Sequence, residues 1–237
     1  MKVTIIGSGR AGRSFALALF RVGHEVTVRH HDQLEDVSGD VVLLTVPDDA
    51  LADVAAALAP DPSRVLAHVA GSRSLAVLAP HPRVASLHPL AALSSPERGA
   101  ERLVGATYCV AGDERVLGLV RSLEGRVITL DDASRTLYHA TATVAANHLV
   151  ALMGQVERLA QGAGLELADF LALASQALAD VTRDSPANAL TGPASRGDVE
   201  TIDAHLAAMP EAERPAYVAL AHAAFELAER RPSVSLA

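Results

Sequence analysis

The chain has 237 residues, of which half are hydrophobic but only 3% are aromatic, so its core must be built from Ala, Val and Leu. The length suits one large domain or two modest ones. A formal net charge of −8 argues against a nucleic-acid-binding surface, and a single cysteine excludes a disulfide framework and a cysteine-based zinc site. Because no apolar stretch reaches the roughly 18 residues of a membrane span and no tripartite secretory signal opens the sequence, we expect a cytoplasmic protein.

The scarcity of lysine is also informative. The only lysine in the chain is Lys2, at the start of the first apolar run. Chemistry that needs a lysine, either as a Schiff-base nucleophile or as a general acid, is therefore excluded. Any catalytic acid or base must be a His, Asp, Glu, Tyr or Cys side chain or a bound water molecule.

The first half of the chain alternates short apolar runs with amphipathic segments. Strands are predicted at residues 3–6, 25–28, 41–46, 65–69, 84–87, 108–111 and 127–130. Between them, helical spacing of Phe15, Leu19 and Val22 predicts a helix over residues 10–22. An Ala-rich helix capped by Asp48 or Asp49 should follow the third strand. This alternation predicts an α/β fold in which residues 1–131 form a Rossmann-like, doubly wound and mostly parallel sheet.

A glycine-rich motif, G-x-G-x-x-G, lies between the first predicted strand and the first predicted helix. It consists of Gly7, Ser8, Gly9, Arg10, Ala11 and Gly12. In such a loop the first glycine permits a tight turn, the second lets the backbone approach a pyrophosphate, and the third lets helix and strand pack closely. The helix N-terminus supplies free N–H groups for the phosphates. We therefore predict dinucleotide binding by these six residues, with a ligand-free glycine-rich turn as the alternative.

The end of the second strand distinguishes the two nicotinamide coenzymes. NAD-binding proteins usually carry a carboxylate there for the ribose 2′-hydroxyl, whereas this chain has Arg29, His30 and His31 before its first acid, Asp32. Arg29 could pair with a 2′-phosphate, so NADP is predicted in preference to NAD, and a solvated basic turn is the alternative. Adjacent residues of an extended segment point to opposite sides, so no metal site is predicted at the two histidines.

Further residues at the carboxyl ends of predicted strands should border the ligand crevice of a doubly wound sheet. Val46, Pro47 and Asp48 end the third strand, Gly71 follows the fourth, and His88 follows the next. The first four are predicted to contact the coenzyme. His88 is a candidate acid–base residue, because histidine titrates near neutral pH, or else a loop histidine held by the turn at the following proline.

The second half, residues 132–237, is predicted to be a helical domain for substrate binding and dimerisation. A long helix should run over residues 135–161, with further helices at 166–180, 198–208 and 211–230. Residues 140–153 of the long helix are nearly all apolar. This predicts that the helix is buried on all sides there, at a subunit interface or against the first domain.

Polar residues in that apolar helix are candidate site residues. His139, Thr143 and Asn147 are spaced four apart and share one face, whereas His148 lies about half a turn from His139, so the two histidines cannot enter one site. Asn147 is predicted to face the substrate, with a buried hydrogen-bonded asparagine as the alternative, and both interpretations stay open for His139. In the glycine- and proline-rich turn at 190–198, Arg196 could hold a substrate carboxylate.

The chain resembles a family of Rossmann-fold oxidoreductases with a helical C-terminal domain of unknown function, over nearly its whole length. The landmarks are the segments 7–12, 46–48, 86–90, 138–140 with Asn147, and 190–198. More distantly it is similar to β-hydroxyacid dehydrogenases, ketopantoate reductases and pyrroline-5-carboxylate reductases. The resemblance implies NADP binding, a cleft between two domains and dimerisation through the helical domain.

One departure from these relatives concerns the proton donor. β-Hydroxyacid dehydrogenases carry a lysine four residues before the asparagine that Asn147 resembles, and here that position is Thr143. Threonine cannot act as a cationic acid, which argues against a straightforward mechanism of that type. An imine substrate that is already protonated, or a histidine donor, would remove the difficulty.

The sequence thus predicts an NADP-dependent reductase or dehydrogenase. Hydride would pass between the nicotinamide and a carbonyl or imine carbon of a small anionic metabolite. His88 or His139 would donate the proton, Asn147 would orient the reacting atom, and Arg196 would hold the anion. The alternative is a dinucleotide-binding sensor or structural dimer without turnover, because the expected lysine is missing and acid–base residues are sparse. The fold alone does not decide between the two, since it hosts many functions.

Overall fold

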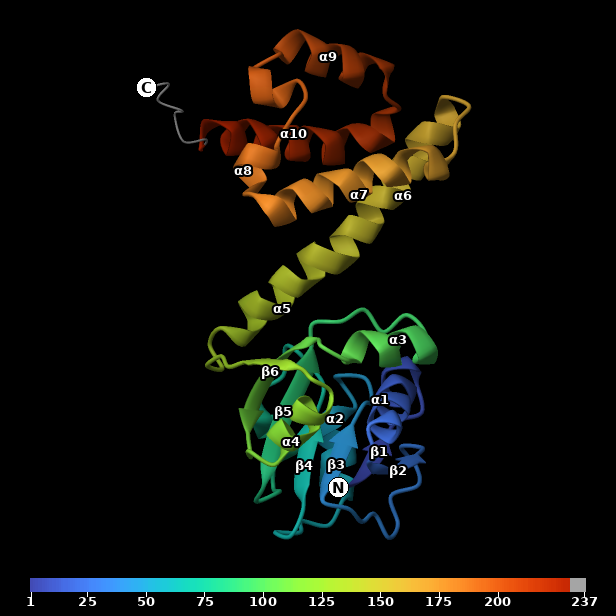
Figure 1. Ribbon diagram of the computed structural model, residues 1–237, viewed down its shortest axis with the longest axis vertical. Coiled ribbons are helices and arrows are strands. Elements are labelled where there is room, and N and C mark those ends of the chain that lie inside the picture. The colour runs from blue at the N-terminus through green and yellow to red at the C-terminus, as the bar shows by residue number, and fades with distance from the viewer. Residues whose placement is uncertain (231–237) are drawn as a thin grey trace. The chain divides into compact units, whose positions relative to one another are not determined.

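The computed structural model describes residues 1–230 of the chain, which divides into two compact units, Met1–Asn147 and His148–Ala237. Figure 1 labels the helices and strands of both units. Residues 231–237, at the end of the predicted second domain, lie outside the described part.

The first unit is built on one seven-stranded sheet of the order β2-β1-β3-β4-β5-β6-β7. Every neighbouring pair is parallel except β5 and β6, which are antiparallel. All seven strands lie where the sequence predicts them. They are β1 (Lys2–Ile6), β2 (Glu25–Arg29), β3 (Val41–Leu44), β4 (Val65–His68), β5 (Val84–Pro89), β6 (Thr107–Gly112) and β7 (Arg126–Ile128).

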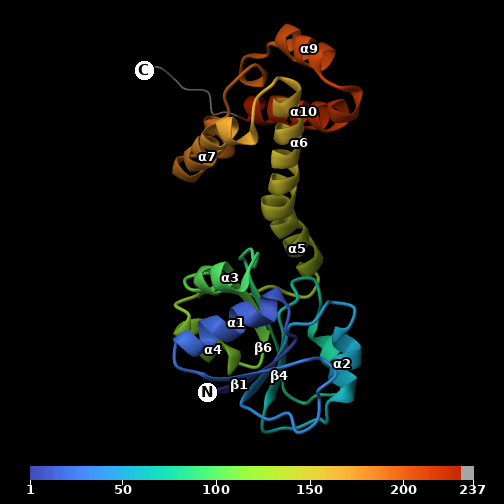
Figure 2. The same cartoon turned by 90° about the vertical axis from the view of Figure 1, so that its right-hand side faces the viewer.

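Helices cover both faces of this sheet, which is why its central strands are continuously apolar. Successive residues of one strand enter opposite cores: Leu43 packs in one hydrophobic cluster and Leu44 in the other. Figure 2 shows α2 on the opposite side of the sheet from α1 and α4. The helices of the sheet unit up to β7 are α1 (Arg10–Arg21), α2 (Leu51–Ala57), α3 (Pro96–Leu103) and α4 (Val116–Ser122).

The long helix predicted at residues 135–161 is present in three consecutive pieces. They are α5 (Arg135–Thr143), a π-helical turn (Val144–His148) and α6 (Leu149–Gly162). The division into compact units falls inside the π-helical turn, later than the boundary predicted after residue 131. The reason is that α5 is bonded to β5 through Arg135 and Tyr138, and so it belongs to the sheet unit.

The second unit is entirely helical in its described part. After α6 come α7 (Leu167–Arg183), α8 (Pro186–Ala189), α9 (Val199–Ala208) and α10 (Arg214–Glu229). Asp198 caps α9 by accepting a hydrogen bond from the Thr201 N–H at 3.0 Å. Burial is sparse: α7, α9 and α10 contain no buried residue. The predicted all-round burial of residues 140–153 is not achieved within the single chain, since Val144 and Val150 are 57% and 72% exposed.

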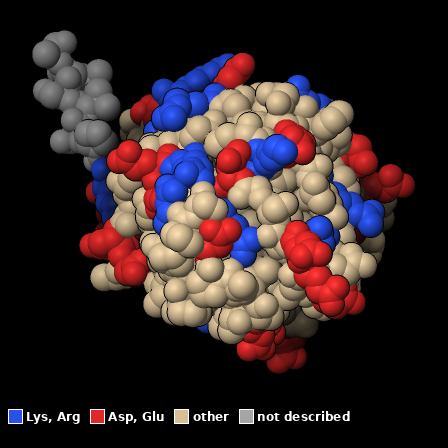
Figure 3. Space-filling view, turned by 90° about the horizontal axis from the view of Figure 1, so that it is seen from below, with Lys and Arg blue, Asp and Glu red and all other residues tan. Residues whose placement is uncertain are grey.

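Two surface properties bear on possible partners. Among residues 1–230, no helix is both long enough and apolar enough to cross a membrane. On the face shown in Figure 3, acidic and basic side chains are intermixed rather than gathered into a field of one sign.

Candidate functional site

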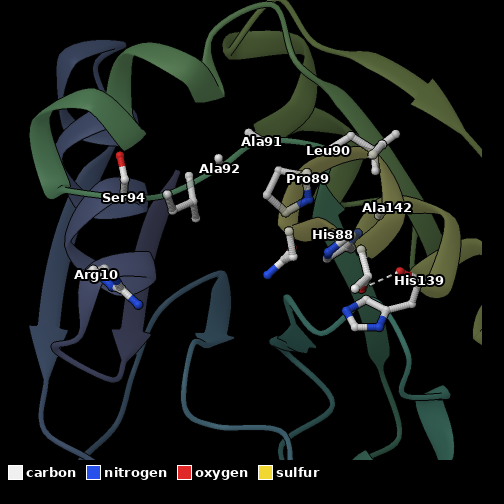
Figure 4. A pocket seen from close by; sticks show the side chains of 14 residues that line it. Arg10, His88, Pro89, Leu90, Ala91, Ala92, Ser94, His139 and Ala142 are labelled. Atoms are coloured by element: carbon white, nitrogen blue, oxygen red, sulfur yellow. Dashed lines mark hydrogen bonds between the residues drawn. The ribbon is translucent and has the colours of Figure 1, made fainter. Parts of the chain in front are cut away.

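The first unit contains a cavity of about 490 Å³ near the carboxyl end of β5. Its walls come from the last residues of β5 and the segment that follows, from α5 with the π-helical turn, and from the first residue of α1 (Figure 4). Most of the residues that line the cavity are apolar, and several are alanines. Six polar side chains also line it: Arg10, His88, Ser94, His139, Thr143 and Asn147.

The glycine-rich loop between β1 and α1 has the close contacts that its motif requires. Gly7 has a φ of +118°, and a Cβ there would lie 2.6 Å from Thr45 Oγ1. A Cβ on Gly12 would clash with the carbonyl oxygen of Gly7. By contrast, a Cβ on Gly9 would meet nothing within 4 Å, so the loop leaves open space beside the N-terminus of α1, where an anion is favoured. Ser8, Arg10 and Ala11 lie in the same loop and first turn.

His88 is held in the wall of the cavity by a single strong hydrogen bond. Its Nδ1 lies 2.7 Å from the Tyr138 hydroxyl, and the two rings meet edge to face with centroids 5.5 Å apart. Burial, with a smaller contribution from neighbouring His139, lowers the pKa of His88 from 6.5 to about 4. The ring is therefore neutral at pH 7.

Gly71, just beyond the end of β4, is packed against both histidines of the cavity. A Cβ at this position would lie 2.9 Å from Nε2 of His88 and 2.8 Å from Cδ2 of His139. The two imidazole centroids are 6.0 Å apart. The structure thus brings together three residues that the sequence placed on separate segments, and any side chain larger than that of glycine would displace the rings.

The polar line predicted on the long helix faces this cavity. His139, Thr143 and Asn147 all line it, and His148 does not. Thr143 Oγ1 donates to the His139 carbonyl at 3.0 Å, as the dashed line in Figure 4 marks. The Asn147 side chain makes no hydrogen bond within residues 1–230, which leaves its amide available to a ligand.

The basic turn after β2 is internally bonded. Arg29 Nη1 donates to the Glu35 carbonyl at 2.8 Å, and Nη2 lies 3.5 Å from the Asp36 carbonyl. His30 pairs with Asp32 at 2.7 Å, and this hydrogen bond lowers the pKa of the Asp32 carboxyl. His31 is exposed beside His30, with ring centroids 4.2 Å apart. A 2′-phosphate at this turn would have to replace the Glu35 and Asp36 carbonyls as the hydrogen-bond partner of the Arg29 guanidinium.

The turn after β3 is linked to the turn after β4. Val46 is half-buried, and Pro47 and Asp48 are exposed. Asp48 Oδ2 accepts a hydrogen bond from Ser72 Oγ at 3.0 Å. The prediction that Asp48 or Asp49 caps α2 is wrong, because the N-cap is Ala50 without a side-chain bond and the Asp48 carboxylate serves the neighbouring turn instead.

Arg196 is not part of this cavity, which is lined by residues of the first unit alone. It belongs to the second unit, in the short turn Ala194–Arg196. Its guanidinium is exposed and lies 4.0 Å from the Asp198 carboxylate.

Sequence reasoning assigned no role to three polar residues beside the site. Tyr138, in one of the landmark segments, bonds His88. Arg135 is 1% exposed, and its guanidinium donates to Ser86 Oγ at 2.9 Å and to Asp132 Oδ1 at 2.8 Å. His68, at the end of β4, is fully buried, and that burial lowers its pKa to about 4. Only the spacing of Arg135 and Tyr138, three apart on one helix face, could have indicated a shared contact.

No group of three or more His, Cys, Asp or Glu side chains within residues 1–230 is arranged to hold a metal ion.

Comparison with known proteins shows what this fold is similar to. Residues 107–224 match the family described as "Domain of unknown function (DUF2520)". A search of the curated proteins found no sequence match. Among solved structures, a candidate NADP oxidoreductase from Bacteroides fragilis superposes with a TM-score of 0.78 at 20% identity, covering 95% of this chain and 98% of its own.

Two further structures are similar over almost their full lengths. A Thermotoga maritima protein has a TM-score of 0.74 at 22% identity, covering 97% of this chain and 100% of its own. The 1-pyrroline-5-carboxylate reductase of Streptococcus pyogenes has a TM-score of 0.64 at 14% identity, covering 95% and 98%. The chain therefore carries a DUF2520 region and has the Rossmann-like sheet and helical C-terminal part found in these oxidoreductase and reductase structures.

Proposed function

We propose that the protein is an NADP-dependent reductase that transfers hydride to a carbonyl or imine carbon of a small anionic metabolite. The observation that carries this proposal is the cavity itself. It places two histidines, a threonine and an asparagine beside the carboxyl end of a parallel strand, with Arg10 of the glycine-rich loop in the same wall. The fold similarity to NADP oxidoreductases and reductases supports the same class.

The residues present fit a dinucleotide. Open space beside Gly9 and the free N–H groups at the start of α1 suit a pyrophosphate. Arg29, with His30 and His31, would suit a 2′-phosphate that takes the place of the Glu35 and Asp36 carbonyls as the partner of its guanidinium. Val46, Pro47, Asp48 and Gly71 would border the rest of the coenzyme. Bound NADPH supplies the hydride, and the protein orients it against the substrate.

Proton delivery is divided between the two histidines. His88 is neutral at pH 7 because its pKa is lowered to about 4, so it acts as a hydrogen-bond donor to the reacting oxygen or nitrogen rather than as a cationic acid. His139, half-buried in the same wall, is then the proton donor. Asn147 orients the reacting atom through its unpaired amide. Arg10 is the cation in the cavity that can attract an anionic substrate, and Arg196 would do so only from the second unit.

A reductase assay tests this proposal. NADPH oxidation would be followed across a panel of 2-keto acids, keto-lactones and cyclic imines, with the wild-type protein and with His139→Gln. We expect turnover of at least one compound and a loss of roughly 100-fold in kcat for the variant, the usual scale of a lost general acid. His148→Gln is the matched control, since this neighbouring histidine does not line the cavity.

Two results would contradict the proposal. Equal rates for wild type and His139→Gln would remove His139 from the chemistry. Tight NADPH binding without oxidation of any compound would favour the alternative, a dinucleotide-binding sensor, for which the absence of a usable lysine is the motivating feature.

We also propose that the second unit associates with another copy of the chain. Its helices leave large apolar side chains exposed, and the single chain does not cover them. They include Val150, Leu171, Leu173, Leu178, Val199 and Leu220.

A further inference from the structure

Two hydrogen bonds between side chains attach α5 to β5, and the spacing of their residues suits both the strand and the helix. Ser86 and His88 are two apart on β5, so they project from the same face of the sheet. Arg135 and Tyr138 are three apart on α5, so they share one face of the helix. Arg135 donates to Ser86 at 2.9 Å and Tyr138 meets His88 at 2.7 Å. The helix is therefore fixed on the strand at two points, one of which is a residue of the cavity.

The direction of the Tyr138–His88 hydrogen bond follows from the two protonation states. Burial raises the pKa of the Tyr138 phenol and lowers that of His88, so both groups are neutral at pH 7. A neutral imidazole has one donor nitrogen and one acceptor nitrogen. Within residues 1–230, the Tyr138 hydroxyl has no other hydrogen-bond partner, so donation to Nδ1 is the arrangement that satisfies its proton within the protein. In that arrangement the imidazole proton resides on Nε2.

The Nε2 edge of His88 lies against Gly71, where a Cβ would come within 2.9 Å of it. Because Gly71 has no side chain, it contributes no polar group to compete for this proton. The ring of His139 lies close by, with its centroid 6.0 Å from that of His88. An N–H at this position is thus a donor with no protein acceptor among the described side chains.

We propose that Tyr138 is a positioning residue, whose hydroxyl donates to Nδ1 of His88 and keeps the single imidazole proton on Nε2 for a ligand in the cavity. This inference rests on the proposed reductase function for its catalytic meaning, but the hydrogen bond and the tautomer do not. A neutral N–H donor complements an acceptor, such as a carbonyl oxygen or an unprotonated imine nitrogen, and opposes an iminium N–H. The pair therefore favours carbonyl substrates over iminium ions.

The tautomer is measured by NMR on the full-length protein labelled with ¹⁵N-histidine, without coenzyme or substrate. Two-bond ¹⁵N–¹H correlations distinguish the two tautomers, and His88→Asn assigns the signals of His88 among those of the ten histidines. We expect His88 to be in the Nε2–H form at pH 7, with its Nδ1 resonance shifted as in a hydrogen-bond acceptor. Tyr138→Phe should remove that shift and allow the Nδ1–H form to appear.

The second unit provides a matched control. His205 Nδ1 and the Tyr217 hydroxyl are also 2.7 Å apart, with their rings at the same interplanar angle of 85°. Tyr217→Phe should change the resonances of His205 and leave those of His88 unaltered. An Nδ1–H form of His88 in the wild-type protein would overturn the proposal even if Tyr138→Phe failed to fold, and so would an unchanged Nδ1 resonance in a folded Tyr138→Phe protein.

Activity provides the second readout. In the reductase assay, Tyr138→Phe should lower kcat by roughly 10-fold to 100-fold, the scale known for losing the hydrogen-bond partner of a metal-bound imidazole. The ratio of carbonyl to cyclic-imine turnover should fall as well, because the donor on Nε2 is no longer fixed. If no compound is reduced, the reductase proposal fails, while the NMR result still decides whether Tyr138 positions His88.

Discussion

At the scale of single residues, the most unusual feature is a pair of buried histidines at the ends of neighbouring parallel strands. His68 ends β4 and is fully buried, and His88 near the end of β5 is half-buried. Burial lowers the pKa of each to about 4. Arg135, a buried cation nearby, opposes protonation of both rings. The environment of the site therefore keeps these imidazoles neutral.

This has a consequence for stability at acid pH, which His68→Asn tests. Between pH 6.5 and about 4 the unfolded chain protonates His68 and the folded chain does not, so the free energy of unfolding falls as pH falls. Between pH 7 and pH 5, the fall in the free energy of unfolding should be about 2 kcal/mol smaller in His68→Asn than in the wild-type protein. The asparagine oxygen can still accept from the Ala70 N–H, which His68 Nδ1 accepts at 3.2 Å. Urea unfolding followed by circular dichroism measures both values.

The control for this prediction is the solvent-exposed His148. His148→Asn should lose as much stability between pH 7 and pH 5 as the wild-type protein. A His68→Asn profile that parallels the wild-type profile would show that His68 is not the group whose protonation destabilises the fold.

At the scale of elements, the strands were predictable because each is a short apolar run buried on both faces of a parallel sheet. Helices α3 and α4 were not predicted. In α3, Gly99 lowers the local helix propensity, and a Cβ there would clash with Ser14 of α1. Glycine there permits the two helices to approach each other, and such a requirement depends on a tertiary contact that the local sequence does not contain.

The part of the candidate site that lies on the long helix could be predicted from helical spacing. His139, Thr143 and Asn147 line one cavity because residues four apart share a helix face, and His148 is outside it as expected. Tyr138 could not be assigned a role in the same way. Its partner is on β5, 50 residues earlier in the chain, and only the docking of α5 brings the two together.

At the scale of the whole molecule, the exposed apolar side chains of the second unit are the basis for its proposed association with another copy of the chain. Light scattering after gel filtration should give the mass of a dimer for the wild-type chain. Leu173, 65% exposed on α7, is the residue to change: Leu173→Glu should shift the equilibrium to monomer, because a buried charge without a partner is costly.

Phe20→Glu serves as the control, since Phe20 is similarly exposed, at 68%, but lies on α1 of the first unit. It should leave the mass unchanged. A wild-type protein that is monomeric at all accessible concentrations would refute association through these helices.

The central claim is that the glycine-rich loop and the turn after β2 bind NADP. The most direct test is calorimetric titration of wild type, Arg29→Ala and Gly9→Ala with NADPH and NADH. Gly162→Ala is the control, since a Cβ at either glycine meets nothing within 4 Å and neither change should disturb the fold. We predict preferential NADPH binding by the wild type and by Gly162→Ala, loss of that preference in Arg29→Ala, and weak binding of both coenzymes by Gly9→Ala. Failure of the wild-type protein to bind either coenzyme would contradict the account.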